Sequence, residues 1–333
     1  MTGARRSPHK KSARIAESRS LTDFDQAVAQ SSTLRDCLRH ACSRLTAAQV
    51  AFGHGTDNAW DEAVWLGLWS LHLPLENVDA FLDARLSVQE RAAFFRLIKR
   101  RCEERLPAAY LTGEAWLGGL RFRADPRAII PRSLIVEALF EGLDPWLNGC
   151  EPRKILDLCT GSGSIAINAA LKFESSQIDA CDLSRDALAL AQENVSDYCL
   201  DSRIRLLHGD LFTPVKNRQY DLILCNPPYV NASSMDKLPA EFLSEPRAAL
   251  AGGQDGMDLV RKILAEAAAA MRRHALLVLE IGHETQNFEA AFGSLEFTYL
   301  PVSAGEKQLV LLSKEQLLAA NLGRSARRTV AKG

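Results

Sequence analysis

The feature that most constrains the fold is a regular alternation of short apolar runs and helical segments, which starts at Lys154. The apolar runs have the length and composition of buried strands. The predicted strands are Ile155–Leu158, Ile178–Cys181, Ile204–Leu207, Leu222–Cys225, Ala275–Glu280, Thr298–Val302 and Leu309–Leu312. The predicted helices between them include Ser164–Phe173, Arg185–Cys199 and Asp258–Arg272. This alternation predicts an α/β fold, a parallel sheet with helices on both faces.

The last two predicted strands are joined by a short turn that contains Gly305. A connection of that length cannot hold a crossover helix, so these two strands should pair antiparallel. We therefore expect a sheet of seven strands that ends in an antiparallel hairpin.

Before about residue 150, apolar residues recur with helical periodicity. Two expected helices begin with capping residues: Asn58 with Asp61, and Ser87 with Glu90. The basic residues Arg96, Lys99, Arg100 and Arg101 have acidic neighbours and are expected on a solvated face, and Gly and Pro residues further on suggest a hairpin. The expected organisation is a disordered basic arm at 1–22, a helical domain at 23–106, a linker hairpin at 107–137, an α/β domain at 138–318 and a basic tail at 319–333.

Composition excludes several classes of protein. The 333-residue chain has a formal net charge of −1, which argues against a dedicated nucleic-acid-binding protein. No apolar run is long enough to span a membrane. The eight cysteines form no C-x-x-C pair and have no histidines at zinc spacing, so we expect buried, reduced thiols, no metal and a cytoplasmic protein.

The run Asp157-Leu-Cys-Thr-Gly-Ser-Gly163 follows a predicted strand and opens a predicted helix. Its glycines let the backbone turn tightly and approach a ligand closely. Asp157 can order that turn and attract a cationic group. Taken alone, such a loop also fits NAD binding, or a tight turn without a ligand.

Acidic residues at the next two strand ends favour S-adenosylmethionine over a dinucleotide. Asp182 can accept hydrogen bonds from a ribose diol. Asp210 can take the exocyclic amine of an adenine while Leu211 packs on the ring. The pattern is D-x-x-x-G-x-G, and it lacks the third glycine of the dinucleotide fingerprint. The predicted cofactor-binding residues are Asp157, Cys159, Thr160, Gly161, Ser162, Gly163, Asp182, Asp210, Leu211 and Asn226.

The run Asn226-Pro227-Pro228-Tyr229 ends the fourth predicted strand, and its four residues are the predicted catalytic residues. Two prolines provide no backbone N–H and hold the chain extended, so that nearby carbonyls remain free acceptors. The Asn226 side-chain oxygen and the Pro227 carbonyl can accept both hydrogens of an NH₂ group, and Tyr229 can stack on the planar group that carries it. The run therefore predicts methyl transfer to an amide or amine nitrogen.

Together with the seven strands, these motifs predict a Rossmann-like methyltransferase domain preceded by a small helical domain. The nitrogen pocket fits an adenine N6 or guanine N2 as well as an amide, so a nucleic-acid amino-methyltransferase stays an alternative. A non-catalytic assembly factor that uses the fold only for binding is a second alternative.

Three segments resemble the protein-glutamine N5-methyltransferases: the D-L-C-T-G-S-G run, N-P-P-Y-V, and Glu245-Pro-Arg-Ala-Ala-Leu-Ala-Gly-Gly-Gln-Asp-Gly256. Release-factor enzymes of this family usually carry P-R-P-E-T-E, where this chain reads Pro131-Arg-Ser-Leu-Ile-Val-Glu137. The segments Phe52–Ala63 and Pro107–Thr112 resemble the branch that methylates large-subunit ribosomal protein L-three. The similarity spans about residues 30 to 320.

The resemblance implies a helical substrate-recognition domain and an S-adenosyl-L-methionine cofactor. It implies that Asn226–Tyr229 hold a substrate glutamine and that Cys159–Gly163, Asp182 and Leu211 line the cofactor. The implied partner is ribosomal protein L-three, with release factors as the alternative substrate. The basic arms, which the family does not require, suggest contact with ribosomal RNA or assembly intermediates. The turn Ser303–Lys307 also departs from the family pattern.

Overall fold

The computed structural model describes residues 26–320, and the chain forms two compact units that divide between Thr112 and Gly113. The predicted arm at 1–22 and residues 321–333 of the predicted tail lie outside the described residues.

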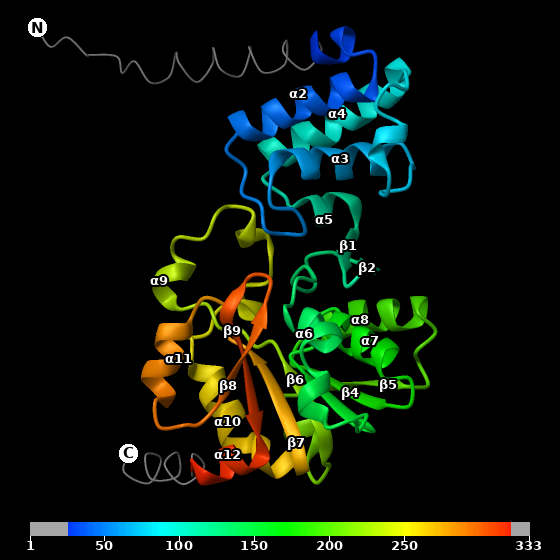
Figure 1. Cartoon of the computed structure of the whole chain (residues 1–333). Helices are drawn as coiled ribbons and strands as arrows, with labels where there is room; N and C mark the ends of the chain where they lie inside the picture. Colours follow the sequence, from blue (N-terminus) through cyan, green and yellow to red (C-terminus); the bar gives the residue numbers. More distant parts are fainter. Residues whose placement is uncertain (1–25, 321–333) are drawn as a thin grey trace, which may run out of the picture. The chain divides into compact units, whose positions relative to one another are not determined.

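The first unit is helical, and its three long helices pack on one another (Figure 1). Its core includes Leu38 of the first long helix, Leu66 of the second and Phe94 of the third, all fully buried. A short helical segment at 26–30 precedes them. The elements are α2 (Leu34–Ala47), α3 (Ala59–Ser70), the 3-10 turn η1 (Val78–Ala80), α4 (Val88–Glu103) and α5 (Ala108–Thr112).

Both predicted helix starts are confirmed. The Asn58 side chain accepts hydrogen bonds from the backbone N–H groups of Trp60 and Asp61, and Ser87 and Glu90 form a capping box. These bonds satisfy N–H groups that the first helical turn leaves without a partner.

The expectation that Arg101 lies on a solvated face is wrong. Its side chain is fully buried, and its Nε donates to Oε1 of Glu62 at 2.7 Å. Its Nη2 donates to the carbonyl of Ala51, and Thr56 donates to the other oxygen of Glu62. Burial raises the pKa of the Glu62 carboxyl, and the Arg101 charge opposes that shift. This buried ion pair holds the loop that leads into α3 in place, because it connects Ala51 and Thr56 of that loop to α3 and α4.

The second unit begins with an antiparallel hairpin, as predicted from its glycines, and continues into the α/β region. The hairpin strands are β1 (Glu114–Leu117) and β2 (Leu120–Arg123). The sheet strands are β3 (Lys154–Leu158), β4 (Gln177–Asp182), β5 (Ile204–His208), β6 (Tyr220–Cys225), β7 (Met271–Glu280), β8 (Thr298–Val302) and β9 (Gly305–Ser313). The helices are α6 (Ile135–Glu141), α7 (Ser164–Lys172), α8 (Arg185–Asp197), α9 (Ala232–Met235), α10 (Asp258–Ala270), α11 (Thr285–Phe292) and α12 (Lys314–Ala319). Short 3-10 turns are η2 (Asp144–Leu147), η3 (Thr213–Val215), η4 (Phe242–Ser244) and η5 (Arg247–Ala249).

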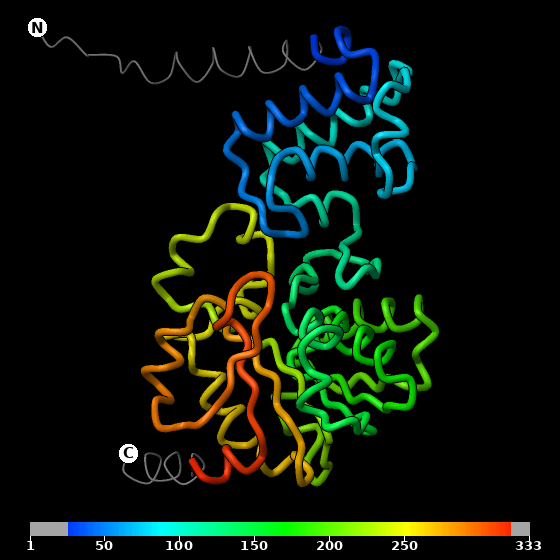
Figure 2. The backbone as a smooth tube through the Cα atoms, viewed as in Figure 1, coloured from blue at the N-terminus to red at the C-terminus, as the bar shows by residue number. Residues whose placement is uncertain are grey.

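The sheet has the predicted seven strands, in the order β5-β4-β3-β6-β7-β9-β8. Neighbouring strands pair parallel from β5 to β7, and β9 runs antiparallel to both β7 and β8 (Figures 1 and 2). The predicted helix Asp258–Arg272 ends earlier, at Ala270, because β7 starts directly at Met271 and pairs there with Tyr220.

Each face of the sheet carries its own apolar core. One core joins alternate strand residues such as Ile155 and Leu222 to α6, α7 and α8. The other joins Leu156 and Ile223 to α10, α11 and α12. Because side chains alternate between the two faces of a strand, this continuous apolar sequence is what a doubly covered parallel sheet requires.

In the part of the chain that the structure describes, no helix is both long enough and apolar enough to cross a membrane. All eight cysteines lie in that part, and all are free thiols. The expectation that they are buried is wrong for Cys150 and Cys199, which follow the ends of η2 and α8 and are exposed.

Candidate active site

The candidate site lies where the strand order reverses. From β3 the chain adds β4 and β5 on one side, and then returns to place β6 on the other side of β3. The last residues of these two central strands, Leu158 and Cys225, are partners in the sheet. Loops that leave adjacent strand ends at a reversal form a crevice, the usual ligand site in such folds. The glycine-rich loop and the Asn226–Tyr229 run therefore start side by side.

The loop after β3 makes three consecutive changes of direction. Cys159, Gly161 and Gly163 have φ values of 58°, 55° and 81°, in the left-handed region. A Cβ at Gly163 would lie 3.2 Å from the Cβ of Ala191 in α8. Glycine at this position therefore permits both the turn and the close packing of α8 on the loop.

Asp157, at the end of β3, stabilises the conformation of this loop through hydrogen bonds. Its side chain is fully buried, and Oδ2 accepts hydrogen bonds from Thr160 Oγ1 at 2.5 Å and from the backbone N of Ala166 at 3.1 Å. Its Oδ1 has no hydrogen-bond partner among the described residues. Burial raises the pKa of the Asp157 carboxyl to about 7, and its two hydrogen bonds oppose that shift.

Asp182 braces the same loop from the end of β4. Its Oδ2 accepts from the backbone N of Gly161 at 2.9 Å, and Oδ1 accepts from the N of Ser184 at 2.8 Å. Each carboxylate oxygen can accept a second hydrogen bond, so the group can still receive two hydroxyls. Burial raises its pKa, and the backbone N–H groups lower it.

The segment after β5 presents one polar and one apolar side chain. Asp210 is exposed, and its carbonyl accepts from the N of Thr213. Leu211 is only 8 % exposed and has a φ of 43°. Leu211 therefore belongs mostly to the core, and only a small part of its side chain can contact a ligand.

A small hollow joins part of the predicted set. Cys159, Thr160, Gly161 and Ser162 line it together with Asn226. Its other wall comes from a segment that sequence reasoning did not assign to the site, Ile129–Ser133. Gly163, Asp182, Asp210, Leu211 and Tyr229 do not line this hollow.

Tyr229 is enclosed by glycines from two later segments. A Cβ at Gly282 would lie 2.5 Å from Cε2 of the Tyr229 ring, and one at Gly252 would lie 2.7 Å from Tyr229 Cα. A Cβ at Gly256 would overlap the Tyr229 carbonyl oxygen. Val230 is then fixed by backbone hydrogen bonds with Leu250 and Gly252. The close approach to Tyr229 therefore explains Gly252 and Gly256 of the Ala251-Gly-Gly-Gln-Asp-Gly256 run, whereas a Cβ at Gly253 would overlap the Asp258 side chain.

Two buried carboxylates anchor the Ile129–Ser133 wall. Glu245 accepts two hydrogen bonds from the Arg132 guanidinium, at 2.5 and 2.7 Å, and a third from the N of Ile130. Glu280, at the end of β7, accepts from Ser133 Oγ at 2.5 Å. The residues of the Ile130-Pro-Arg-Ser133 segment could be read from the sequence. Their carboxylate partners could not be predicted, because no residue close in sequence indicates them.

Glu280 also reaches Tyr229, whose hydroxyl donates to its Oε1 at 3.4 Å. Burial raises the pKa of the Tyr229 phenol, and the Glu280 charge raises it further. Burial likewise raises the pKa of the Glu280 carboxyl, against the effect of its hydrogen bonds to Ser133 and Leu134. One buried acid thus connects the hollow's wall to the predicted catalytic run.

Comparison with known proteins gives a consistent result. The model of the Methyltransferase small domain family matches residues 137–274. The ribosomal protein uL3 glutamine methyltransferase of Bordetella pertussis is 55% identical to this chain, covering 86% of it and 96% of the relative. The proteins of the same name from Burkholderia pseudomallei and Neisseria meningitidis serogroup A are 52% and 49% identical, covering 86% and 89% of this chain and 96% and 97% of their own lengths.

Among solved structures, the Thermus thermophilus 16S rRNA N2 G1207 methyltransferase in complex with AdoMet and guanosine is similar with a TM-score of 0.41 and 20% identity. The similarity covers 60% of this chain and 49% of that one.

Proposed function

This chain belongs to the ribosomal protein uL3 glutamine methyltransferases, and from that membership we propose that it methylates the N5 amide nitrogen of one glutamine in uL3, the large-subunit ribosomal protein L-three. The observation that carries the proposal is the pairing of Leu158 with Cys225. It brings the predicted cofactor loop and the predicted amide pocket to one crevice, as methyl transfer between two bound molecules requires.

We assign the cofactor, S-adenosyl-L-methionine, to the crevice beside the glycine-rich loop. The left-handed turn through Gly161 and Gly163 supports this assignment, because glycines let the backbone approach a ligand closely. Asp182 retains acceptor capacity for a ribose diol, and exposed Asp210 can accept from an adenine amine. When bound, the cofactor supplies a methyl group on a positively charged sulfonium.

We assign the substrate amide to Asn226 and Pro227. The Asn226 side-chain oxygen and the Pro227 carbonyl accept the two amide hydrogens and so fix the plane of the group. Asn226 also lines the hollow beside the cofactor loop, which supports a role next to the bound cofactor. Pro228 holds the run extended, and Tyr229 packs beside the amide.

The energies of the available interactions limit how this pocket can promote methyl transfer. Amide resonance gives a rotation barrier of about 18–20 kcal/mol. Two hydrogen bonds of about 1–3 kcal/mol each cannot cancel that resonance. Orientation of two bound reactants can contribute about 7–11 kcal/mol. The pocket therefore acts by holding the nitrogen in line with an activated methyl group, and the nitrogen loses its proton to water after transfer.

We propose that the basic arms, which lie outside the described residues, contact ribosomal RNA or assembly intermediates. A protein that modifies a bacterial ribosomal protein works where ribosomes are made, and we therefore propose a cytoplasmic location. The helical unit is the proposed substrate-recognition domain, and the division of the chain at 106, 137 and 318 stays a prediction.

Mass analysis of ribosomal proteins and release factors from cells with and without the gene tests this function. We expect uL3 to lose one methyl mass on a single glutamine in the deletion strain. If uL3 is unchanged while a release factor or a ribosomal RNA base loses its methyl group, the substrate assignment is wrong although methyl transfer stands.

A further inference from the structure

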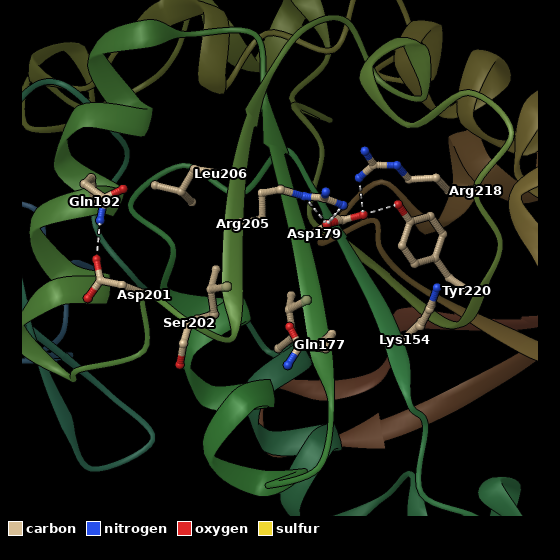
Figure 3. A pocket seen from close by; sticks show the side chains of 12 residues that line it. Lys154, Gln177, Asp179, Gln192, Asp201, Ser202, Arg205, Leu206, Arg218 and Tyr220 are labelled. Carbon is tan, nitrogen blue, oxygen red and sulfur yellow. Dashed lines mark hydrogen bonds and ion pairs between the residues drawn. The ribbon is translucent and has the colours of Figure 1, made fainter.

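Two surface hollows adjoin at the amino ends of the parallel strands, the end of the sheet opposite to the candidate active site. Lys154, Arg205 and Arg218 provide the cations of the first hollow (Figure 3). Arg153 and Arg273 help to line the second. Since Arg153 and Lys154 are consecutive at the start of β3, the two hollows form one surface. Together they carry six lysine and arginine side chains against four carboxylates, in a chain whose formal net charge is −1.

The first hollow holds two guanidinium groups in fixed positions. Asp179 is buried and accepts hydrogen bonds from Arg205 Nη2 at 2.6 Å, Arg218 Nη1 at 2.9 Å and the Tyr220 hydroxyl at 2.6 Å (Figure 3). One carboxylate thus faces two guanidinium groups, which leaves a positive charge uncompensated. Both arginine side chains remain partly exposed, so they have N–H groups left to donate to a ligand.

Three cations of the two hollows have no acidic partner among the described residues, because the nearby Asp221 is engaged elsewhere. Asp221 accepts from the backbone N–H groups of Arg153 and Lys154 and from the Arg272 guanidinium, at 2.9, 2.8 and 2.9 Å. This carboxylate is therefore occupied by the starts of β3 and β7. The charged groups of Arg153, Lys154 and Arg273 are exposed, and within residues 26–320 none has a hydrogen-bond or ion-pair partner.

An exposed aromatic ring lies among these cations. Trp146, in η2, lines the second hollow and is 43% exposed. Single-stranded nucleic acids are bound by such combinations, because cations follow the phosphates while bases stack on aromatic rings. An acidic protein segment would use the cations but would gain no stacking from the indole.

We propose that this amino-end surface binds single-stranded RNA, with its cations on successive phosphates and Trp146 stacked on a base. The methyl-transfer site lies at the other ends of the strands, so the proposal rests on none of its residues. The amino-end surface consists of Trp146, Arg153, Lys154, Arg205, Arg218 and Arg273.

The contribution of the cations to RNA binding can be measured by fluorescence anisotropy. The full chain is titrated against a labelled single-stranded RNA of about 20 nucleotides, at salt concentrations from about 50 to 200 mM. The variant Arg153→Gln/Lys154→Gln/Arg273→Gln should bind at least about tenfold more weakly, and its log–log salt slope should fall by about 2. The control Arg185→Gln/Lys237→Gln/Lys262→Gln removes three other exposed cations of the same unit and should retain both the affinity and the slope.

A second pair of variants tests the stacking. Trp146→Ala should weaken RNA binding about fivefold or more and leave the salt slope unchanged. Its matched control is Trp116→Ala, at a tryptophan of β1 that is 39% exposed and should bind RNA as the wild type does.

Equal losses in the two triple variants, or wild-type binding by the amino-end variant, would overturn the proposal. Polyglutamate that competes as well as unlabelled RNA would instead identify an acidic protein as the partner. The amino-end variant should still methylate isolated uL3 at the wild-type rate. Failure of RNA binding is thereby separated from failure of the proposed methyl transfer.

Discussion

The Tyr229 hydroxyl lies 3.4 Å from Oε1 of Glu280, while Oε2 of the same carboxylate accepts hydrogen bonds from Ser133 and Leu134. Glu280 does not line the hollow beside the cofactor loop, and it bonds to Ser133, which does. It is therefore a positioning residue, which holds Tyr229 in relation to the wall of that hollow.

Glu280→Gln should lower kcat for uL3 methylation by roughly 10- to 100-fold, because a hydrogen bond to a charged group contributes about 1.5–3 kcal/mol. The KM for the cofactor should stay near its wild-type value, since Glu280 does not reach the glycine-rich loop. Steady-state kinetics measure both quantities. Glu289→Gln, at a partly exposed carboxylate of α11 that bonds to Tyr299 and Lys307, is the control and should leave kcat unchanged. A Glu280→Gln enzyme with wild-type kcat would contradict the positioning role.

Gly282→Ala should displace the Tyr229 ring. The added Cβ would lie 2.5 Å from Cε2 of that ring, and the φ of 52° adds backbone strain of about 1 kcal/mol. Methylation should fall by about 100-fold, since small misplacements of reacting groups cost that much. Gly119→Ala is the matched control, because its φ is 75° and its Cβ would meet nothing within 4 Å. If the two variants lose activity equally, backbone strain rather than displacement of Tyr229 is the cause.

Asn226→Ala should remove one of the two acceptors of the substrate amide. We expect a decrease of about 100-fold or more in the methylation rate, since the nitrogen is no longer held in line with the methyl group. Calorimetric titration with the methylated and demethylated cofactor should show affinities within about twofold of wild type. An active alanine variant would refute the assignment of Asn226, and a large loss of cofactor affinity would place it in the cofactor site alone.

Asp157 should make the stability of the fold dependent on pH. Its pKa is raised to about 7 by burial, above its value of 3.8 in an unfolded chain. The folded state therefore binds the proton more tightly, so this contribution is fully present below the unfolded pKa of 3.8 and is lost as the pH rises from there through about 7. Asp157→Asn cannot lose a proton and should show a smaller drop in melting temperature between about pH 5 and pH 8. Parallel melting curves for the two proteins would disagree with a raised pKa.

The central strands, such as β3 and β6, could be predicted because each is a nearly continuous apolar run, as a strand covered on both faces requires. The caps at Asn58 and Ser87 could be predicted because the residues that form them are three or fewer positions apart in sequence. Arg101 could not be placed, since its partner Glu62 lies 39 positions away and the adjacent acids suggested a solvated helix face.

In the candidate site, too, the parts with local sequence signals could be predicted and the parts that depend on distant partners could not. The loop after Asp157 and the run after Cys225 carry local signals, namely glycines and prolines beside a strand end. The wall at Ile129–Ser133 depends on Glu245 and Glu280, which are more than 100 positions away. Sequence periodicity contains no information about such pairings, so the two anchoring carboxylates appear only in the folded chain.

Ser133 and Glu280 are separated by 147 positions in the sequence. During synthesis, the wall at 129–133 leaves the ribosome long before the end of β7, and its Ser133 end cannot be anchored until that strand joins the sheet. A nascent chain therefore acquires this site only when nearly the whole methyltransferase unit has been translated. Partial products that already contain the glycine-rich loop and the Asn226–Tyr229 run lack the carboxylate that connects them to the wall.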